Sequence, residues 1–461
     1  MKKLIIIAVL VLFSAPALAQ WVAEGQDPQL WAYGDTDTLP GDHNATLAGL
    51  QWNVSGSYVV AAGGMVWSWG GWGQASYVQP ETSNLYGDNR QSKLSYFTPG
   101  AGWVGAYGGT LSGGGATGPV GFNNGAGTSL PVIGQGTSGS YSPTSVASYV
   151  VCDAAATSDP SDADGDVKIA SFGGYPRWSA PADIYNVTQD YWYAAGVNPN
   201  TDVYARGVQI GSKFYHLNGD GVAYDYTVFD LTTETWSQGN LNAVLVKSHS
   251  WGYGTSVVVT NSAGAYYWQD FSTDTTTAFT NNPATSDAGA EGVVWRNYFV
   301  QISPLGNVEY YDLTQGPTGV WVDSGVPAPG PGANGNGACV IGTTIYWSLH
   351  GTVGTDAEKG MLYSLDISVL GIPMPLPGDV DGNGVVDGLD LTAVISAWET
   401  EPCDALWDPD ADLDGNGVVN GLDLTEVISN WTVAGAAAAE PESAKPGKRV
   451  GNVRKGSGNA K

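Results

Sequence analysis

Residues 228–236 read VFDLTTETW, a strand-like phrase that ends on an aromatic residue. Similar phrases end on Trp192, Phe279 and Trp321, so that the closing aromatics follow one another after 44, 43 and 42 residues. Trp103 lies 89 residues before Trp192, which is about two further periods. Aromatics on a lattice of about 43 residues indicate a repeat architecture. The other phrases are YFTPGAGW (96–103), IYNVTQDYW (184–192), FSTDTTTAF (271–279) and YYDLTQGPTGVW (310–321).

The repeat is built from short strands. Between about residues 21 and 370, runs rich in Val, Tyr, Trp and Thr alternate with Gly, Asn and Ser turns. A strand pair precedes each phrase, for example VQIGSKFYHLNG at 208–219. Such a unit buries its sheet face only against its neighbours, so the units must close into a ring. The sequence therefore predicts a mainly β fold over residues 20–370, a β-propeller of six or seven blades.

The unit resembles the kelch repeat, whose blades pair a Gly-Gly strand with a YDLxTxxW strand. Gly63-Gly64 and Gly173-Gly174 stand where the two glycines are expected, whereas the later units lack them. The resemblance implies a kelch-like β-propeller. Most such propellers bind partners, although one secreted branch oxidises alcohols with copper.

A second motif occurs twice near the C-terminus, as DVDGNGVVDGLD from Asp379 and as DLDGNGVVNGLD from Asp412. Each copy fits a twelve-residue calcium loop, with oxygen ligands at positions 1, 3, 5, 7, 9 and 12 and glycine at position 6. Calcium takes six to eight oxygens, so two loops predict two Ca²⁺ ions. The predicted ligands are Asp379, Asp381, Asn383, the Val385 carbonyl, Asp387 and Asp390, then Asp412, Asp414, Asn416, the Val418 carbonyl, Asn420 and Asp423.

Each loop runs into one predicted helix. Apolar residues recur at i, i+3, i+4 and i+7, and no helical pattern precedes either loop. This loop–helix half of an EF-hand, used twice over 378–432, resembles a type I dockerin. The resemblance implies calcium-dependent folding and a cohesin-like receptor as partner, and the near-identity of the halves implies that either helix can face it. The apolar positions are Leu391, Val394, Ile395 and Trp398, and Leu424, Val427, Ile428 and Trp431.

Positions 10 and 11 depart from the best-known dockerins, in which a Ser-Thr pair that contacts cohesin often stands. Here they are Gly388-Leu389 and Gly421-Leu422. The partner class is unchanged by this departure, but the specificity for a given cohesin is open. A calcium-stiffened stalk without a partner is the alternative reading of the module.

The remaining segments are an export signal, a linker and a tail. Lys2 and Lys3, the apolar run 4–13 and Ala17-Leu18-Ala19 predict a signal peptide over 1–19. No later segment is long and apolar enough to span a membrane, so we expect a secreted, extracellular or cell-surface protein. The three prolines of 371–377 predict an extended linker, and 433–461 predicts a disordered basic tail.

The charge balance excludes a nucleic-acid partner. The chain has 461 residues, with 17 Lys+Arg against 44 Asp+Glu and a net charge of −27, and phosphate would repel it. Thirteen of the acids lie in 378–432, which holds no Lys or Arg. The acidity of this segment is therefore tied to the predicted metal sites.

Other candidate features leave alternatives open. Cys152 and Cys339 form one disulfide or remain buried thiols, and Cys403 is left over. SDADGDVK predicts a surface turn in preference to a third calcium site at Asp162, Asp164 and Asp166. The aromatics Trp67, Trp69, Trp72, Trp251 and Tyr253 are core residues or a sugar-stacking platform, and His43, His216, His249 and His350 show no spacing typical of a metal cluster.

These features predict a non-catalytic, secreted binding protein. Its propeller would bind a polysaccharide, a cell-surface glycan or a protein, and its dockerin-like module would attach the chain to an extracellular assembly. A carbohydrate-active enzyme is the second hypothesis, since dockerins usually carry polysaccharide-degrading cargo, and a structural surface-layer component is the third. No catalytic residue is identified by motif.

Overall fold

The computed structural model divides the chain into two compact units, Met1–Pro373 and Met374–Lys461. This division falls inside the predicted linker 371–377. The structure describes residues 21–26, 53–106, 145–349, 361–374 and 376–432, with gaps. The gaps are 56–57, 70–71, 75–88, 91–93, 153–163, 173–180, 190, 198, 200–205, 218–224, 241–248, 261–263, 274, 285–290, 304–305, 330–334, 402–403, 405 and 415–416. The predicted signal peptide (1–19) and tail (433–461) lie outside the described residues.

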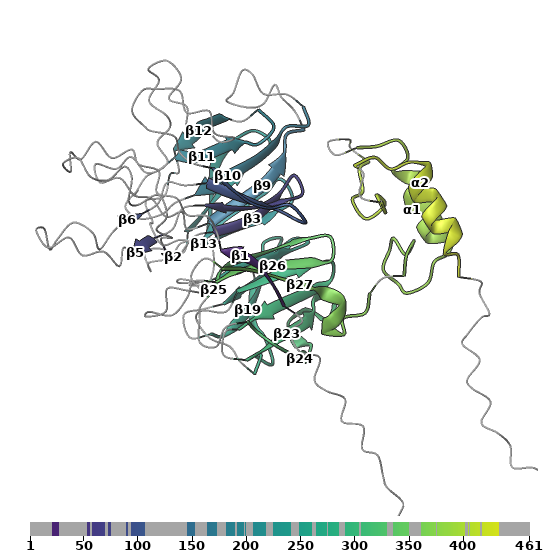
Figure 1. Ribbon diagram of the computed structural model, residues 1–461. Coiled ribbons are helices and arrows are strands. Elements are labelled where there is room, and N and C mark those ends of the chain that lie inside the picture. Colours follow the sequence, from purple (N-terminus) through teal and green to yellow (C-terminus); the bar gives the residue numbers. More distant parts are fainter. Residues whose placement is uncertain are drawn as a thin grey trace, which may run out of the picture. The chain divides into compact units, whose positions relative to one another are not determined.

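The first unit consists of antiparallel sheets, most of them of four strands (Figure 1). Four sheets are each built from consecutive strands, as the repeated phrase predicts. They are β9 (Ser145–Val150), β10 (Val167–Phe172), β11 (Pro181–Asn186) and β12 (Tyr191–Val197); β13 (Arg206–Ile210), β14 (Lys213–Leu217), β15 (Asp225–Asp230) and β16 (Thr235–Asn240); β17 (Ser250–Tyr253), β18 (Ser256–Thr260), β19 (Tyr266–Asp270) and β20 (Thr275–Ala278); and β21 (Glu291–Trp295), β22 (Tyr298–Ile302), β23 (Asn307–Asp312) and β24 (Trp321–Pro327).

A fifth sheet joins the two ends of the unit. Strands β25 (Gly335–Ile341), β26 (Thr344–Leu349) and β27 (Met361–Asp366) are completed by β1 (Val22–Gln26), which pairs antiparallel with β27. The first strands of neighbouring sheets lie beside one another, and β25 contacts β3 (Tyr58–Ala62), which in turn contacts β9. The sheets therefore close into a ring, and the unit is a β-propeller.

The predicted blade number of six or seven is not confirmed, because five regular blades are recognised. The sheet of β3, β4 (Met65–Trp69), β7 (Leu94–Thr98) and β8 (Gly102–Ala106) holds a place in the ring but departs from the repeat. Between β4 and β7 the chain leaves to form β5 (Trp72–Gln74) and β6 (Asn89–Arg90), which join β2 (Asn53–Ser55) in a three-stranded sheet. The residues of this excursion lengthen the chain without adding a regular blade. An estimate of the blade number from a constant period of about 43 residues is therefore too high.

The periodic tryptophans connect neighbouring blades. The indole N–H of Trp236, on β16, donates to the Gly196 carbonyl on β12 of the preceding blade at 3.0 Å. Trp321 donates to Asn281 at 3.0 Å, and Trp103 donates to Gly25 at 3.2 Å. Each bond joins the outer strand of one blade to the chain at or just after the outer strand of the blade before it. Three of the five periodic aromatics thus make an interblade hydrogen bond, which gives the repeat of about 43 residues a physical cause.

The apolar core also lies between blades. Phe172 on β10 stacks on Phe214 on β14, with ring centroids 3.9 Å apart, and both are fully buried. Trp251 on β17 packs on Phe299 on β22, with centroids 4.7 Å apart. Burial of such rings between sheets supplies most of the stabilisation of a propeller, since one blade alone has no covered face.

The repeated aspartates form the turns between third and fourth strands. The carboxylate of Asp230 accepts from the Thr232 N–H at 2.9 Å, and that of Asp270 accepts from the Ser272 N–H at 2.8 Å. The hydrogen bonds from Ser272, led by its hydroxyl, lower the pKa of Asp270. Of the glycine pairs that carry the kelch resemblance, Gly63-Gly64 forms the β3–β4 turn with positive φ at both residues, whereas 173–174 lie outside the described residues.

The second unit, the C-terminal module, contains two short helices, α1 (Gly388–Ser396) and α2 (Gly421–Ser429). Each begins at the end of a predicted loop, and among the described residues of the unit no helix leads directly into either loop. Four valines with no exposed area form the centre of its core, namely Val386, Val394, Val419 and Val427. The predicted apolar stripes divide: Leu391 and Leu424 pack against this core, whereas Ile395, Trp398, Ile428 and Trp431 are exposed.

Candidate metal centre

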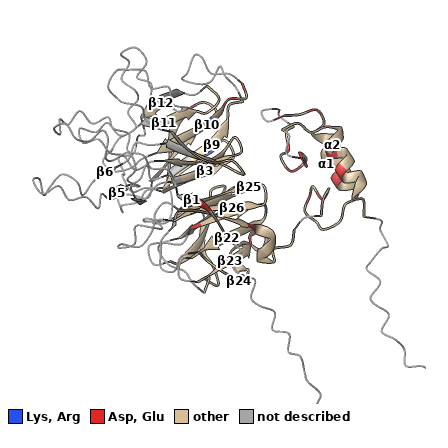
Figure 2. Ribbon diagram, in the orientation of Figure 1, with Lys and Arg blue, Asp and Glu red and all other residues tan. Residues whose placement is uncertain are grey.

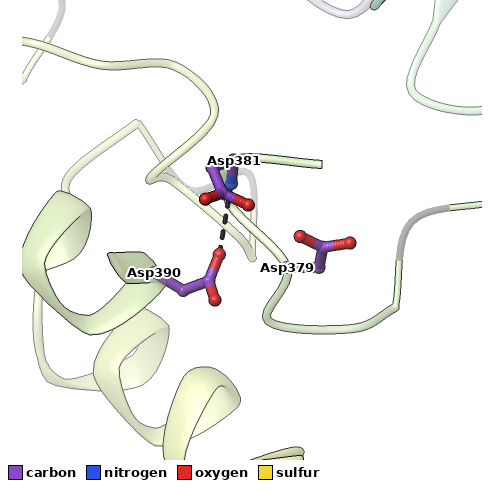
Figure 3. Close-up of side chains that lie close together, drawn as sticks. All are labelled: Asp379, Asp381 and Asp390. Carbon is purple, nitrogen blue, oxygen red and sulfur yellow. Dashed lines mark hydrogen bonds between the residues drawn. The ribbon is translucent and has the colours of Figure 1, made fainter. Parts of the chain in front are cut away.

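The first loop brings three carboxylates together. Oxygens of Asp379, Asp381 and Asp390 all lie within 4.8 Å of one another (Figure 3). Asp379 and Asp390 are buried, and Asp381 is exposed. Three of the predicted ligand side chains, at positions 1, 3 and 12, therefore converge although the last is contributed by a helix.

Backbone hydrogen bonds hold this arrangement. One oxygen of Asp390 accepts from the N–H of Val380 at 2.7 Å and from that of Asp381 at 3.2 Å. Its other oxygen accepts from the Asp387 N–H at 2.7 Å, as part of the capping box of α1. Asp379 accepts from the Gly384 N–H at 2.8 Å, and Gly384 has a φ of +84°, which a residue with a Cβ rarely adopts. The helix start and the loop are thus one hydrogen-bonded unit.

The second loop repeats these contacts with almost the same distances. Carboxylate oxygens of Asp412, Asp414 and Asp423 lie within 4.8 Å of one another. Asp423 accepts from the N–H of Leu413 at 2.7 Å, from that of Asp414 at 3.2 Å and from that of Asn420 at 2.7 Å. Asn416, the predicted ligand at position 5, lies outside the described residues.

The predicted ligands at position 9 have a different role in the structure. Asp387 accepts from the Leu389 N–H at 2.8 Å and is the N-cap of α1, and Asn420 does the same for α2 through the Leu422 N–H. Neither residue belongs to the carboxylate groups described above. Helix capping thus accounts for both of them, and their predicted role as ligands stays a prediction.

The predicted ligands at positions 5 and 7 lie within a network of hydrogen bonds inside each loop. The side-chain oxygen of Asn383 accepts from the Val385 N–H at 2.8 Å, and its amide nitrogen donates to Asp381 at 2.8 Å. Val385 is exposed, and in the second loop the Val418 carbonyl accepts from the Asn420 amide nitrogen at 3.0 Å.

The chemistry of the donors fits a hard divalent cation. Each group holds three carboxylates, and no Lys or Arg occurs between 378 and 432 to neutralise them. Figure 2 shows acidic residues in the loops and at the starts of α1 and α2. Carboxylates this close repel one another unless a cation or a proton lies between them. Oxygen-only ligands with loop carbonyls are what calcium prefers.

In the weaker metal candidate of the propeller, the two described residues, Asp164 and Asp166, belong to no comparable group. Asp166 is buried and accepts from the Asn186 amide at 2.9 Å and from the Gln189 amide at 3.2 Å. Asp164 is exposed, and Asp162 lies outside the described residues. Asp166 therefore stabilises blade structure, which agrees with the predicted surface turn.

The histidines and aromatics were the other open candidates. His216 is fully buried, and His249 lies 3.3 Å from Glu291 on the next blade, while His43 and His350 lie outside the described residues. Trp67 is a core residue, 3% exposed, and donates to the Ala62 carbonyl at 3.0 Å. Trp251 and Tyr253 are half-buried between blades, and nothing is described of the side chains of Trp69 and Trp72.

The disulfide between Cys152 and Cys339 is not formed. Cys152 is an exposed free thiol just after β9, and Cys339 is a buried free thiol on β25. Cys339 lies in an apolar cluster with Val66, Phe97 and Leu362, which encloses it. Burial raises the pKa of its thiol to about 12. Cys403 lies outside the described residues.

Each half of the module exposes three large apolar side chains, and the extent of this exposure was not predicted from the sequence. Leu389 is 62% exposed and Leu422 is 61% exposed, although both belong to the helices that close the loops. A helical period identifies apolar positions but does not say which of them a two-helix unit is too small to cover. The six residues are Leu389, Ile395 and Trp398, and Leu422, Ile428 and Trp431.

Comparison with known proteins agrees with the dockerin resemblance of the C-terminal module. The family described as the dockerin type I domain matches residues 377–434, and this domain follows the propeller in the chain. No curated protein matches the chain. A solved structure, described as the structure of YjhT, is similar at 14% identity and a TM-score of 0.33, over 40% of this chain and 70% of that one. In the described part of the chain, no helix has the length and apolar character needed to cross a membrane.

Proposed function

We propose that the dockerin type I domain at 377–434 folds around two calcium ions and attaches the chain to a cohesin-bearing assembly outside the cell. Dockerin type I domains bind Ca²⁺ and cohesins, and proteins that contain them are typically extracellular or at the cell surface. The observation that carries the proposal is the duplicated group of three carboxylates, with Asp390 and Asp423 buried in equivalent positions. One Ca²⁺ per group would offset most of its negative charge.

The proposed receptor surface is the exposed apolar set on each half. Ile395 and Ile428 are 56% and 58% exposed, and Trp398 and Trp431 are 38% and 41% exposed. Large apolar side chains left in water on a small helical unit mark an interaction site. Because the two sets are matched residue by residue, we propose that either half can receive the cohesin-like partner. Leucine in place of a hydroxyl side chain at position 11 favours a cohesin with an apolar contact at this point.

We further propose that the propeller is the cargo and that it binds a polysaccharide, a cell-surface glycan or a protein without turnover. Among the described residues, the buried His216, the His249–Glu291 pair and Asp166 contact other parts of the blades. These contacts support structural roles for the two histidines and for Asp166, which the sequence had offered as candidate metal ligands. The domain arrangement, a propeller followed by an attachment module, supports a binding protein that is displayed on an assembly.

The attachment is tested by measuring binding of the full chain to a panel of purified cohesins, with calcium and with a chelator. We expect binding to at least one cohesin that chelation abolishes. Because the halves are equivalent, Leu389→Ala or Leu422→Ala alone should weaken binding by less than about threefold, and the double variant by more than about tenfold. Val320→Ala, at a 62% exposed valine of the propeller, is the matched control and should change nothing. Calcium-independent binding, or an unaffected double variant, would contradict the proposed surface.

The cargo role is tested on a panel of soluble and insoluble polysaccharides, scoring retention and product release together. Retention without release supports the binding function. Release of oligosaccharides would replace it with the enzyme hypothesis. Absence of both, with the chain found in a regular surface array, would favour the structural component.

A further inference from the structure

Each calcium loop is held by the chain segment that follows the helix of the other half. Val419, at position 8 of the second loop, accepts from the Glu399 N–H at 2.8 Å and donates to the Thr400 carbonyl at 2.9 Å. Glu399 and Thr400 lie just after α1. Val386, at position 8 of the first loop, accepts from the Thr432 N–H at 2.8 Å. Thr432 lies just after α2.

The two connections differ in one atom. The Val419 N–H bonds to a backbone carbonyl, that of Thr400, whereas the Val386 N–H bonds to a side-chain hydroxyl, Oγ1 of Thr432, at 2.9 Å. Val386 and Val419 have no exposed area, so neither N–H can turn to water instead. A buried N–H that loses its partner keeps the full cost of its desolvation. At position 8, therefore, the first loop depends on a side chain from outside the loop, whereas the second uses a backbone carbonyl.

The first loop is also in contact with α2 where it begins. Gly378, directly before Asp379, lies so close to α2 that an added Cβ would be 2.9 Å from Cα of Val427 and 3.0 Å from the Glu426 carbonyl oxygen. Gly378 has a φ of +85°, so glycine is required on both counts. The first loop thus contacts α2 at the residue directly before it, Gly378. At its position 8, Val386, it is hydrogen-bonded to Thr432, which follows α2.

Position 8 adjoins the carbonyl that serves as the ligand at position 7 in this kind of loop. In the first loop the Val386 N–H is part of the same peptide group as the Val385 carbonyl. Fixing that N–H therefore fixes the direction of the carbonyl, because the peptide group is planar. A contact from outside the loop can in this way set the geometry of a predicted ligand.

We propose that Thr432 is a positioning residue for the first calcium loop: its hydroxyl, through the Val386 N–H, orients the Val385 carbonyl and so sets the calcium affinity of that loop. The inference rests on the proposed binding of calcium by both loops. It makes the metal affinity of the N-terminal half dependent on a side chain that follows the C-terminal helix. The reverse dependence uses backbone groups alone, since the Thr400 hydroxyl donates to the Ala397 carbonyl and not to the second loop.

The test follows each loop separately in the full chain labelled with ¹⁵N-glycine. The N–H groups of Gly384 and Gly417 donate to Asp379 and Asp412, each at 2.8 Å, so each reports on its own loop. The variants Asp379→Ala and Asp412→Ala assign the two signals. Calcium titrations then give one midpoint for each glycine.

In Thr432→Val, which keeps the shape of the side chain and removes the acceptor, we expect the Gly384 midpoint to rise about three- to tenfold. The Gly417 midpoint should move by less than about twofold. Thr432→Ser, which retains the hydroxyl, should restore the Gly384 midpoint to within about threefold of the original chain. Thr400→Val is the matched control: it should leave the difference between the two midpoints unchanged, because the Val419 N–H bonds to a carbonyl.

Equal shifts of both midpoints in Thr432→Val, or none, would overturn the proposal. If this variant does not reach the calcium-loaded spectrum, Thr432→Ser decides, and a Gly384 midpoint that rises more than about threefold counts against the hydroxyl. The failure of the proposed function has a separate signature. If calcium moves neither glycine signal in the unmodified chain, the calcium sites themselves are wrong.

Discussion

The ammonium group of Lys168 lies 3.3 Å from a carboxylate oxygen of Glu234, and both side chains are completely buried. Lys168 is on β10, and Glu234 is in the turn between β15 and β16, so the pair connects two neighbouring blades. The same carboxylate oxygen accepts from the Tyr149 hydroxyl at 3.1 Å. Glu234 has a φ of +51°, which places its side chain in this position at some cost in backbone strain.

We expect Lys168→Met to lower the free energy of unfolding of the propeller by about 3–5 kcal/mol, because it leaves the Glu234 carboxylate buried without its countercharge. Chemical denaturation followed by tryptophan fluorescence measures the change. Lys213→Met makes the same substitution at an exposed position of β14 and should alter stability by less than about 0.5 kcal/mol. Similar effects of the two variants would show that the buried Lys168–Glu234 pair contributes no more to the free energy of unfolding than an exposed lysine does.

Trp236→Phe should destabilise the propeller by about 1–2 kcal/mol, since the Gly196 carbonyl loses its donor while most of the ring remains. The measurement is the midpoint of thermal unfolding of the full chain. Trp398→Phe, at an exposed tryptophan of the C-terminal module, serves as control and should leave the propeller transition in place. An unchanged midpoint for Trp236→Phe would mean that the periodic tryptophans act through ring packing alone.

Chelation of calcium should unfold the C-terminal module and leave the propeller folded, because the carboxylates of each loop repel when no cation lies between them. Differential scanning calorimetry should show two transitions in excess calcium. The one that disappears on chelation should also disappear in the Asp379→Ala/Asp412→Ala variant. At a hundredfold excess over Kd, each ion would add about 2.7 kcal/mol of stability. A single transition that ignores calcium would refute this prediction.

The two described cysteines should differ in their reaction with iodoacetamide at pH 8. Cys152 is exposed and should be alkylated, whereas Cys339 is buried and its pKa of about 12 keeps it a thiol at this pH. Mass spectrometry of the Cys403→Ser variant should therefore find one modified residue in the folded chain and two after denaturation. Modification of Cys339 in the folded chain would contradict its enclosure by β3, β4 and β7.

The sequence predicted those parts of the structure in which a given residue type makes the same contact each time it recurs. Trp236 and Trp321 recur because each makes the same interblade bond, so their spacing identified a repeated unit of strands. Asp390 and Asp423 were identified because the spacing of a calcium loop permits little variation.

Other features depend on contacts between distant segments, which a spacing does not contain. The excursion of β5 and β6 interrupts one sheet without changing the local pattern of aromatics, so the blade number was overestimated. Asp387 was predicted as a calcium ligand from its position in the loop, and its second role, as the N-cap of α1, is visible only in the structure. The enclosure of Cys339 combines side chains of its own sheet with Val66 and Phe97 of the neighbouring one, and only the folded ring shows that Cys152 does not reach it.

The pairing of β1 with β27 has a consequence for the synthesis of the chain. The hydroxyl of Ser364 donates to the Glu24 carboxylate, and these residues are 340 positions apart. The strand that a ribosome makes first must therefore wait for the one that it makes among the last, and until then the ring has two open edges. Unpaired edges are templates for wrong partners, and ring closure over such a separation is slow. Nascent chains thus remain vulnerable to aggregation until Met361–Asp366 has emerged.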